Sequence, residues 1–277
     1  MRLGATVFGR YYAGDSVVHR MDPRAKLLIV LVYMVAAVLA VDLWGVAELA
    51  AFTLACVLLS RIPLREVFDS VKPLLFILVF TALLNVLTVS EGTVYWHWAM
   101  LTISSGGFWH ALVFTLRVGL MLFGASLLTL TTTTIDLADG IEALLKPFAR
   151  VGLPAHELAM MTSIALRFLP TFLDEGVKIK RAQESRGATF DEGGPWQRLK
   201  MLVPLLSPLF ASAFRHANEL SMAMESRCYH GAEGRTSLRA LLFGRADYVG
   251  FAMAIVMVAL LVVTRVMLSA GVTGHFA

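Results

Sequence analysis

Charged residues are scarce in this sequence. Asp, Glu, Lys and Arg make up 16% of its 277 residues, whereas a typical soluble domain is about 25% charged. Hydrophobic residues account for 57% of the chain, and its mean hydropathy is +0.71. This balance excludes an ordinary soluble domain and indicates an integral membrane protein. We therefore expect the chain to lie in the lipid bilayer and to bind no nucleic acid.

Cysteine is also rare. The two cysteines, Cys56 and Cys228, provide no disulfide framework. We expect Cys56 to lie within the membrane and Cys228 in the cytosol, so both should be reduced thiols. No cleavable signal peptide is visible, because the N-terminal residues are polar and mixed and the first long apolar run begins at Leu27.

Catalytic motifs are missing as well. The sequence has no Walker loop, no Gly-x-Gly-x-x-Gly string and no nucleophile elbow, so we expect no ATP hydrolysis by this chain. His156-Glu157 lacks the second histidine one turn later that a metalloprotease helix requires. Asp136 and Asp139 lack the further acidic repeat of phospholipid-alcohol transferases. A polytopic membrane enzyme is therefore only an alternative, and no catalytic or metal-binding residue is assigned.

Long apolar runs are what the sequence does contain. A helix needs about 20 apolar residues to cross a bilayer, with a range of about 17–25. Because lipid offers the backbone no hydrogen-bond partner, such runs are expected to be helices. Only Asp42 separates the first two runs, which predicts a tight hairpin there. Five stretches qualify as spans: 25–41, 43–60, 73–89, 108–130 and 248–268.

The predicted fold class is an all-α integral membrane protein. It has about five transmembrane helices, with long cytoplasmic amphipathic helices inserted before the last span. Four parts follow along the chain. They are a cytoplasmic N-terminal segment at 1–24, four transmembrane helices at 25–134, a cytoplasmic helical domain at 135–247, and the last transmembrane helix with an extracytoplasmic tail at 248–277.

The orientation follows from the positions of Lys and Arg, which favour the cytoplasmic side. These residues cluster before the first span, in the loop at 61–72 and throughout the large polar segment. The loop at 90–107 and the turn at Asp42 contain neither. We therefore expect the N-terminus in the cytoplasm and the C-terminus outside.

The loop at 90–107 is rich in aromatic residues. Tyr95, Trp96, His97 and Trp98 lie within it, and Trp109 follows. This pattern favours an interfacial aromatic belt. A substrate-facing lid is the alternative.

Arg117 lies inside the fourth span, where a charge is costly and usually faces protein or water. Glu48 enters the second span from the same side, and the depths differ by roughly 6 Å at about 1.5 Å per residue. We predict that Arg117 pairs with Glu48 or with a backbone carbonyl for structural reasons. A substrate or proton relay at Arg117 is the weaker interpretation, because no chain of ionisable residues continues across the membrane. A standalone secondary transporter is a second alternative, and the lack of a visible inverted repeat argues against it.

The polar segment predicts further helices. Thr134 is suited to cap a helix that begins at Ile135. A second helix should start at Pro154, a favoured first-turn residue, and run to Arg186. Pro170 should kink this second helix.

A third helix is expected to begin near Pro195. Pro204 and Pro208 should interrupt it, so that Ser207 caps a separate last helix ending near Arg227. The apolar faces of these helices suit packing on each other, contact with the membrane boundary, or docking of a partner.

The two longest of these helices end in nearly the same string. Ala182-Gln183-Glu184-Ser185-Arg186 closes one, and Ala223-Met224-Glu225-Ser226-Arg227 closes the other. A cation stabilises a helix C-terminus by about 0.3–1 kcal/mol, but the glutamates oppose the helix dipole. A protruding arginine can instead offer its five-donor fork to carboxylates or helix-end carbonyls of another protein. The repeat therefore predicts two docking tips.

Several strings in chain order resemble one family. They are Asp22-Pro23-Arg24-Ala25-Lys26-Leu27-Leu28, Gly152-Leu153-Pro154-Ala155-His156-Glu157-Leu158-Ala159, Ala165-Leu166-Arg167-Phe168-Leu169-Pro170-Thr171, and the two arginine strings with the glycines that follow them. Over nearly its whole length the chain is similar to the T component of energy-coupling factor (ECF) transporters, which are ATP-driven importers of vitamins and metal ions.

The resemblance implies a non-catalytic coupling subunit in the plasma membrane of a prokaryote. Such a subunit transmits the motion of two cytosolic ATP-binding-cassette ATPases to a membrane substrate-binding subunit, the S component, for vitamin or metal-ion uptake. The long amphipathic helices would be its coupling helices. ATP and Mg would be bound by the partner subunits, and this chain would bind no cofactor.

The resemblance also implies site residues. The ATPase contacts would be Ser185, Arg186, Gly187, Ser226, Arg227 and Cys228. The residues facing the S component would be Leu166, Phe168, Leu169, Phe172, Leu209, Phe210 and Ala213. At 185 and 226 serine stands where the family usually has alanine, and Cys228 stands where it usually has glycine. Glycine would more easily end a helix in a left-handed turn, so the geometry of the second tip is in question.

Overall fold

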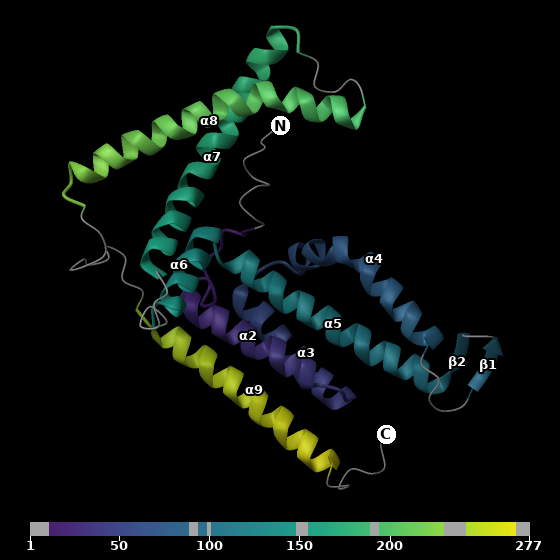
Figure 1. Ribbon diagram of the computed structural model, residues 1–277. Helices are drawn as coiled ribbons and strands as arrows, with labels where there is room; N and C mark the ends of the chain where they lie inside the picture. Colours follow the sequence, from purple (N-terminus) through teal and green to yellow (C-terminus); the bar gives the residue numbers. More distant parts are fainter. Residues whose placement is uncertain are drawn as a thin grey trace. The chain divides into compact units, whose positions relative to one another are not determined.

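The computed structural model describes residues 11–88, 94–98, 101–147, 155–188, 194–229 and 242–269 (Figure 1). Its elements are α2 (Pro23–Leu39), α3 (Leu43–Ser60), α4 (Leu64–Thr88), β1 (Val94–Trp98), β2 (Leu101–Ser104), α5 (Ser105–Thr131), α6 (Thr134–Leu145), α7 (Ala155–Ser185), α8 (Pro195–Glu225) and α9 (Arg245–Ser269). They form two compact units. One holds α2 to α6 with α9, and the other holds α7 and α8.

The helices of the first unit confirm a helical membrane protein. Among the described residues, four helices are long and apolar enough to cross a membrane: Leu43–Ser60, Leu64–Thr88, Gly106–Thr131 and Arg245–Leu268. α2 has 17 residues, the lower end of the spanning range. Each predicted span therefore coincides with a helix, and α2 meets α3 through a turn at 40–42 as expected.

α4 begins earlier than the apolar run predicts, at Leu64, and continues through Pro73. Its first turns are amphipathic. Val67 and Val71 are buried, whereas Asp69 pairs with Lys72 at 2.5 Å on the exposed side. Because the apolar run starts only where the charges stop, the sequence indicated the membrane-crossing part of the helix and missed its polar beginning.

A small antiparallel hairpin connects α4 and α5, and the sequence did not predict it. β1 pairs with β2 in a register that places Val94 opposite Ser104 and Trp98 opposite Leu101. β2 packs against α4 and α5. The aromatic residues 95–98 lie on β1, but their side chains are outside the described part, so the belt and the lid are both left as predictions.

Two helix boundaries in the polar segment correct the sequence-based expectations. α6 is capped by Thr133 rather than Thr134, because the Asp136 amide donates to Thr133 Oγ1 at 3.2 Å and the Thr133 hydroxyl donates to Asp136 Oδ2 at 2.6 Å. α8 is one unbroken helix through Pro204 and Pro208. A proline removes one backbone hydrogen bond, yet the 31-residue helix continues through both positions.

Small residues let the helices of the first unit approach closely. One buried cluster joins Tyr33, Ala36, Ala37, Ala40, Leu49, Met257 and Leu261 from α2, α3 and α9. A Cβ on Gly124 would lie 2.5 Å from the Tyr33 ring, so this glycine makes room for the tyrosine. The Tyr33 hydroxyl then donates to the Leu120 carbonyl at 2.9 Å and hydrogen-bonds with Thr53 Oγ1 at 2.8 Å.

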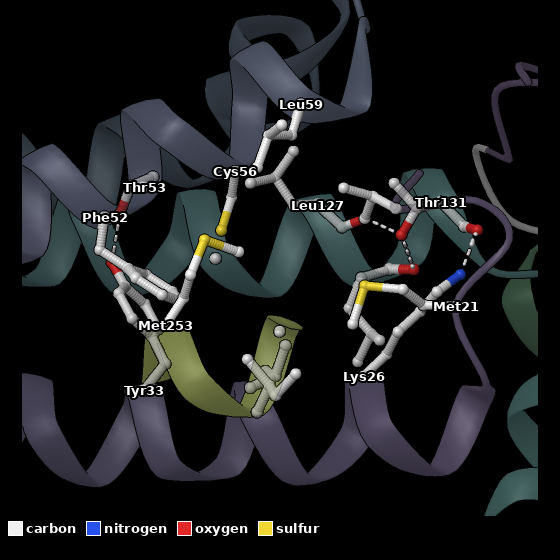
Figure 2. Close-up of a pocket in the computed structure, with 16 residues that line it drawn as sticks. Met21, Lys26, Tyr33, Phe52, Thr53, Cys56, Leu59, Leu127, Thr131 and Met253 are labelled. Carbon is white, nitrogen blue, oxygen red and sulfur yellow. Dashed lines mark hydrogen bonds between the residues drawn. The ribbon is translucent and has the colours of Figure 1, made fainter. Parts of the chain in front are cut away.

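A cavity of about 90 Å³ lies among α2, α3, α5 and α9, with polar groups at its ends (Figure 2). Tyr33 and Thr53 lie at one end, and Lys26 and Thr131 lie at the other (Figure 2). The Lys26 ammonium is buried and donates to three oxygens: the carbonyls of His19 and Thr131 and the hydroxyl of Thr132, at 3.0–3.3 Å. Three acceptors match the three donors of an ammonium, so the cation is fully hydrogen-bonded.

Asp22 and Asp247 complete this anchor at the start of α2. Asp22 caps the helix by accepting from the Arg24 amide at 2.9 Å. Asp247, at the start of α9, is 2% exposed and accepts from the Asp22 amide at 2.8 Å and from the Gly244 amide at 2.7 Å. The beginnings of α2 and α9 are therefore joined through one buried carboxylate.

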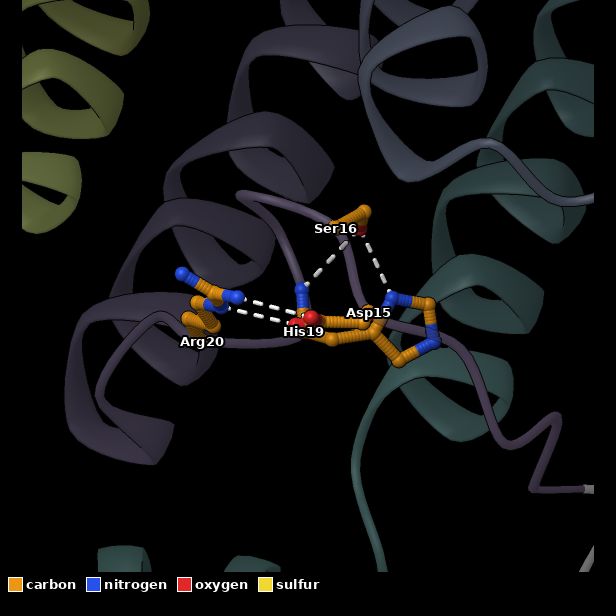
Figure 3. Close-up of polar contacts among 4 residues, drawn as sticks. All are labelled: Asp15, Ser16, His19 and Arg20. Carbon is orange, nitrogen blue, oxygen red and sulfur yellow. Dashed lines mark hydrogen bonds and ion pairs between the residues drawn. The ribbon is translucent and has the colours of Figure 1, made fainter.

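The segment before α2 folds into a turn against the end of α5 (Figure 3). The Tyr12 amide donates to the Leu130 carbonyl at 3.0 Å. Ser16 Oγ lies 2.7 Å from His19 Nδ1 and also accepts from the His19 amide (Figure 3). Arg20 holds Asp15 through two 2.7 Å hydrogen bonds, which lower the pKa of the Asp15 carboxyl.

Replacing the buried lysine tests this anchor. Lys26→Met keeps the apolar stem but leaves the His19, Thr131 and Thr132 oxygens without their donor. Each buried acceptor left unpaired costs about 1–3 kcal/mol. We expect a clear drop in the thermal unfolding temperature of the detergent-solubilised protein.

The matched control is Lys72→Met, because the Lys72 side chain is 72% exposed and its ion pair lies at the surface. That change should leave the unfolding temperature nearly unaltered. Equal effects of the two substitutions would contradict the anchoring role of Lys26.

Candidate functional site

α7 and α8 form the second unit and carry most of the residues that the sequence singled out (Figure 1). Each is a 31-residue helix with a broad apolar face. Their C-terminal turns are polar and are the positions of the repeated string. Both helices end in the same pattern of backbone hydrogen bonds.

The first tip is a Schellman motif. The Gly187 amide donates to the Glu184 carbonyl at 3.0 Å, and the Ala188 amide donates to the Gln183 carbonyl at 3.0 Å. Gly187 has a φ of +90°, in the left-handed region that favours glycine. This pair of bonds satisfies helix-end carbonyls and places Arg186 at the C-cap position.

The second tip repeats the same bonds with different residues. The Cys228 amide donates to the Glu225 carbonyl at 2.9 Å, and the Tyr229 amide donates to the Met224 carbonyl at 3.1 Å. Cys228 has a φ of 57° and takes the left-handed conformation that Gly187 takes at the first tip. Arg227 is therefore a C-cap residue as well. The cysteine keeps the geometry, at a cost of about 1–2 kcal/mol for a residue with a Cβ.

The glutamates that the helix dipole left unexplained are bonded along their own helices. Glu184 lies 3.5 Å from the Lys180 ammonium, one turn earlier. Glu225 accepts from the Ser221 hydroxyl at 3.4 Å, also one turn earlier. Each carboxylate thus points back along its helix.

The serines of the repeat also turn inward. The Ser185 hydroxyl donates to the Arg181 carbonyl at 3.0 Å, and the Ser226 hydroxyl donates to the Ala223 carbonyl at 3.0 Å. Both arginines are exposed, and neither forms an ion pair with a described residue. Each tip therefore presents one guanidinium on a backbone frame that is already hydrogen-bonded.

The seven apolar residues expected to face a membrane partner divide into three groups. Phe168 and Phe172 pack around His216 where the helices cross, with ring centroids 5.8 and 5.9 Å from the histidine ring. Leu166, Leu209 and Ala213 are half-buried. Phe210 and Leu169 are exposed, by 62% and 37%. The first group contributes to holding α7 and α8 together, and the exposed residues are open to a partner.

Sequence reasoning missed the most exposed aromatic residue of α8. Phe214 is 70% exposed and lies one turn after Phe210. Val203 and Leu206 extend the same stripe, with 61% and 46% of their surfaces exposed. Residues 203, 206, 210 and 214 have the spacing of one helix face. The helical periodicity of apolar residues could therefore have identified Phe214 from the sequence.

Arg117 and Glu48 are the remaining assigned residues. The Arg117 guanidinium donates to the Ala40 carbonyl at 3.5 Å and lies 5.2 Å from the centroid of the Phe114 ring. No ion pair joins it to Glu48 in the described structure, and Glu48 Oε2 is buried without a hydrogen-bond partner. The contact that forms is thus the backbone carbonyl, one of the two partners the sequence left open.

Comparison with known proteins extends the likeness beyond these motifs. Residues 14–238 match the family described as CbiQ, cobalt transport protein. The energy-coupling factor transporter transmembrane protein EcfT of Thermosediminibacter oceani is 48% identical over 88% of this chain and 91% of its own length. The proteins of the same name from Ruminiclostridium cellulolyticum and Bacillus subtilis are 47% and 41% identical over 86% and 95% of this chain, and over 89% and 99% of their own lengths. The chain therefore belongs to the CbiQ and EcfT family, the multi-pass transmembrane components of energy-coupling factor transporters.

Proposed function

We propose that this chain couples two cytosolic ATPases to a membrane S component that binds a vitamin or a metal ion. The observation that carries the proposal is the pair of arginine-capped tips. They share one hydrogen-bond pattern although their sequences differ at three of six positions between 183 and 188 and between 224 and 229. Two matched tips fit two similar partner subunits.

The chemistry of each tip suits a groove lined by acceptors. A guanidinium has five donors in a planar fork, which can bind a carboxylate or several helix-end carbonyls at once. Because the helix-end carbonyls next to Arg186 and Arg227 are already bonded within the Schellman motifs, the forks are available to a partner.

ATP and Mg belong to the ATPases in this proposal. The sequence of this chain offers no phosphate-binding loop. The proposed role of this chain is mechanical and non-catalytic, because α7 and α8 act as coupling helices that transmit motion between the partner subunits. In this proposal both tips and the N-terminus lie on the cytoplasmic side and the C-terminus lies outside, which the distribution of Lys and Arg supports.

The exposed stripe of Val203, Leu206, Phe210 and Phe214 is the proposed contact for the S component. A contiguous apolar stripe on a polar helix marks an interface with a partner or with lipid. Aromatic residues supply large contact areas at interfaces. The S component would determine which substrate is carried.

Charge reversal at the tips tests the docking role. Co-expression with candidate cassette ATPases and purification through a tag on the ATPase should recover the parent chain. The double variant Arg186→Glu and Arg227→Glu should lose co-purification, because two guanidinium forks become carboxylates facing acceptors. Arg215→Glu is the matched control, since Arg215 is an exposed arginine within α8. Unchanged recovery of the double variant would rule out the tips as the dock.

Cys228 gives a second test that depends on backbone conformation alone. Cys228→Gly removes the cost of the left-handed conformation and should strengthen ATPase co-purification or leave it unchanged. Cys228→Val places a β-branched residue at a positive φ and should weaken it by about tenfold, because strain of about 1–2 kcal/mol disfavours the capped tip. The measurement is the apparent affinity of the purified chain for the ATPase pair. Equal affinity of the valine and glycine variants would show that the second tip does not need this turn.

The aromatic stripe is tested by polar replacement. The double variant Phe210→Ser and Phe214→Ser should lower recovery of a co-expressed S component while ATPase recovery persists. Met222→Ser is the control on the same helix, because Met222 is 62% exposed and its position in the helical periodicity lies off the stripe. Full recovery of the S component with the phenylalanine variant would place its contact elsewhere.

A further inference from the structure

The most buried side chain described on the two coupling helices is polar. Ser212 of α8 is 2% exposed, whereas every other described side chain of α7 and α8 is partly or fully exposed. A serine buries little apolar area, so hydrophobic burial does not explain its position at the crossing. Its partner does.

That partner is Glu175 of α7. The Ser212 hydroxyl donates to Glu175 Oε1 in a short hydrogen bond between residues 37 positions apart. Glu175 Oε2 is buried without a hydrogen-bond partner and lies 3.9 Å from His216 Nε2. The donor belongs to one helix and the acceptor to the other, so this hydrogen bond is a direct polar link between α7 and α8. The contact therefore ties the two helices together at one point.

His216 and two phenylalanines surround this polar contact. The His216 ring lies nearly parallel to Phe168 of α7, with an interplanar angle of 19° and centroids 5.8 Å apart, and Phe172 lies 5.9 Å away. On its other side His216 Nδ1 lies 3.5 Å from Glu219 Oε2. The His216 ring thus contacts two phenylalanines of α7 and lies close to the carboxylates of both Glu175 and Glu219.

A polar bond within an apolar crossing restricts how the helices can move. Apolar faces can slide by a turn at small cost, because many registers give similar contact. A buried polar pair is satisfied in one register only, which is the best-attested use of such pairs. Rotation about the bond costs less than sliding along it.

The position of the bond determines how far each arginine tip lies from the crossing of the two helices. Arg186 is 11 residues beyond Glu175, and Arg227 is 15 residues beyond Ser212. At about 1.5 Å per residue the tips lie about 16 and 22 Å from the bond. A rotation of about 10° at the crossing would move them by about 3 and 4 Å in opposite senses.

We propose that Ser212 and Glu175 form the pivot about which α7 and α8 rotate when the ATPases close. They are positioning residues, since they touch neither ATPase nor substrate. This inference rests on the proposed docking of Arg186 and Arg227, because the pivot converts the approach of two ATPases into rotation of one crossing.

The experiment measures the distance between the helix ends in the assembled complex. Spin labels are attached at Ala182→Cys and Ala223→Cys, both at exposed positions. The two native cysteines are replaced by Cys56→Ser and Cys228→Gly. Pulsed electron paramagnetic resonance then gives the label-to-label distance with and without ATP and Mg.

The parent complex should show a narrow distance distribution that shifts when ATP is added. In Ser212→Ala and in Glu175→Ala the distribution should broaden and the shift should be lost, while ATPase co-purification persists. Glu175→Gln retains an acceptor oxygen and should restore the narrow distribution. Ser221→Ala, an exposed serine of the same helix, should match the parent.

Two outcomes would overturn the pivot. One is a parent complex whose distance does not respond to ATP, and the other is a narrow, shifting distribution in both alanine variants. Loss of co-purification from the parent chain itself would contradict the proposed docking instead. The ATP hydrolysis rate supplies a further readout, since a lost pivot should change its stimulation by the T component by about 5-fold or more.

Discussion

A backbone that enters hydrocarbon must satisfy its own hydrogen bonds, and this requirement organises the first unit. Within a span the helix meets it, so the unsatisfied groups collect at helix ends. There the protein places buried polar side chains. Asp22 caps α2, Asp247 accepts from the amides of Asp22 and Gly244, and Lys26 donates to oxygens near the end of α5. The spans are thus joined through their ends, and within them small residues permit close packing, as Gly124 does for Tyr33.

Backbone hydrogen bonding also shapes the ends of α7 and α8. At each C-terminus the backbone closes on itself, which leaves the C-cap side chain as the group that faces outward. Arg186 and Arg227 occupy that position because the hydrogen bonds before and after them are the same. The tip is therefore specified by backbone conformation more than by neighbouring side chains. This explains why serine is tolerated at 185 and 226 and why Cys228 can hold the turn usual for glycine.

The apolar faces of α7 and α8 serve two different purposes. Phe168 and Phe172 are engaged with His216 at the crossing, whereas Phe210 and Phe214 are open. A helix pair held only by apolar contact would have many nearly equal registers. The buried bond from Ser212 to Glu175 joins the pair at one defined point, and the side chains of the outer stripe take no part in it.

The sequence by itself determined the spans, the amphipathic helices, the two arginine tips and the family, because hydropathy, periodicity and short motifs are local along the chain. It placed the cap of α6 one residue late, and it broke α8 at Pro204 and Pro208, because local propensity disfavours a proline inside a helix that the folded chain nevertheless continues. Tertiary structure alone decided that Arg117 meets the Ala40 carbonyl and that Ser212 is buried on Glu175. Each of these depends on groups brought together by folding, and such contacts leave no periodic mark in the sequence.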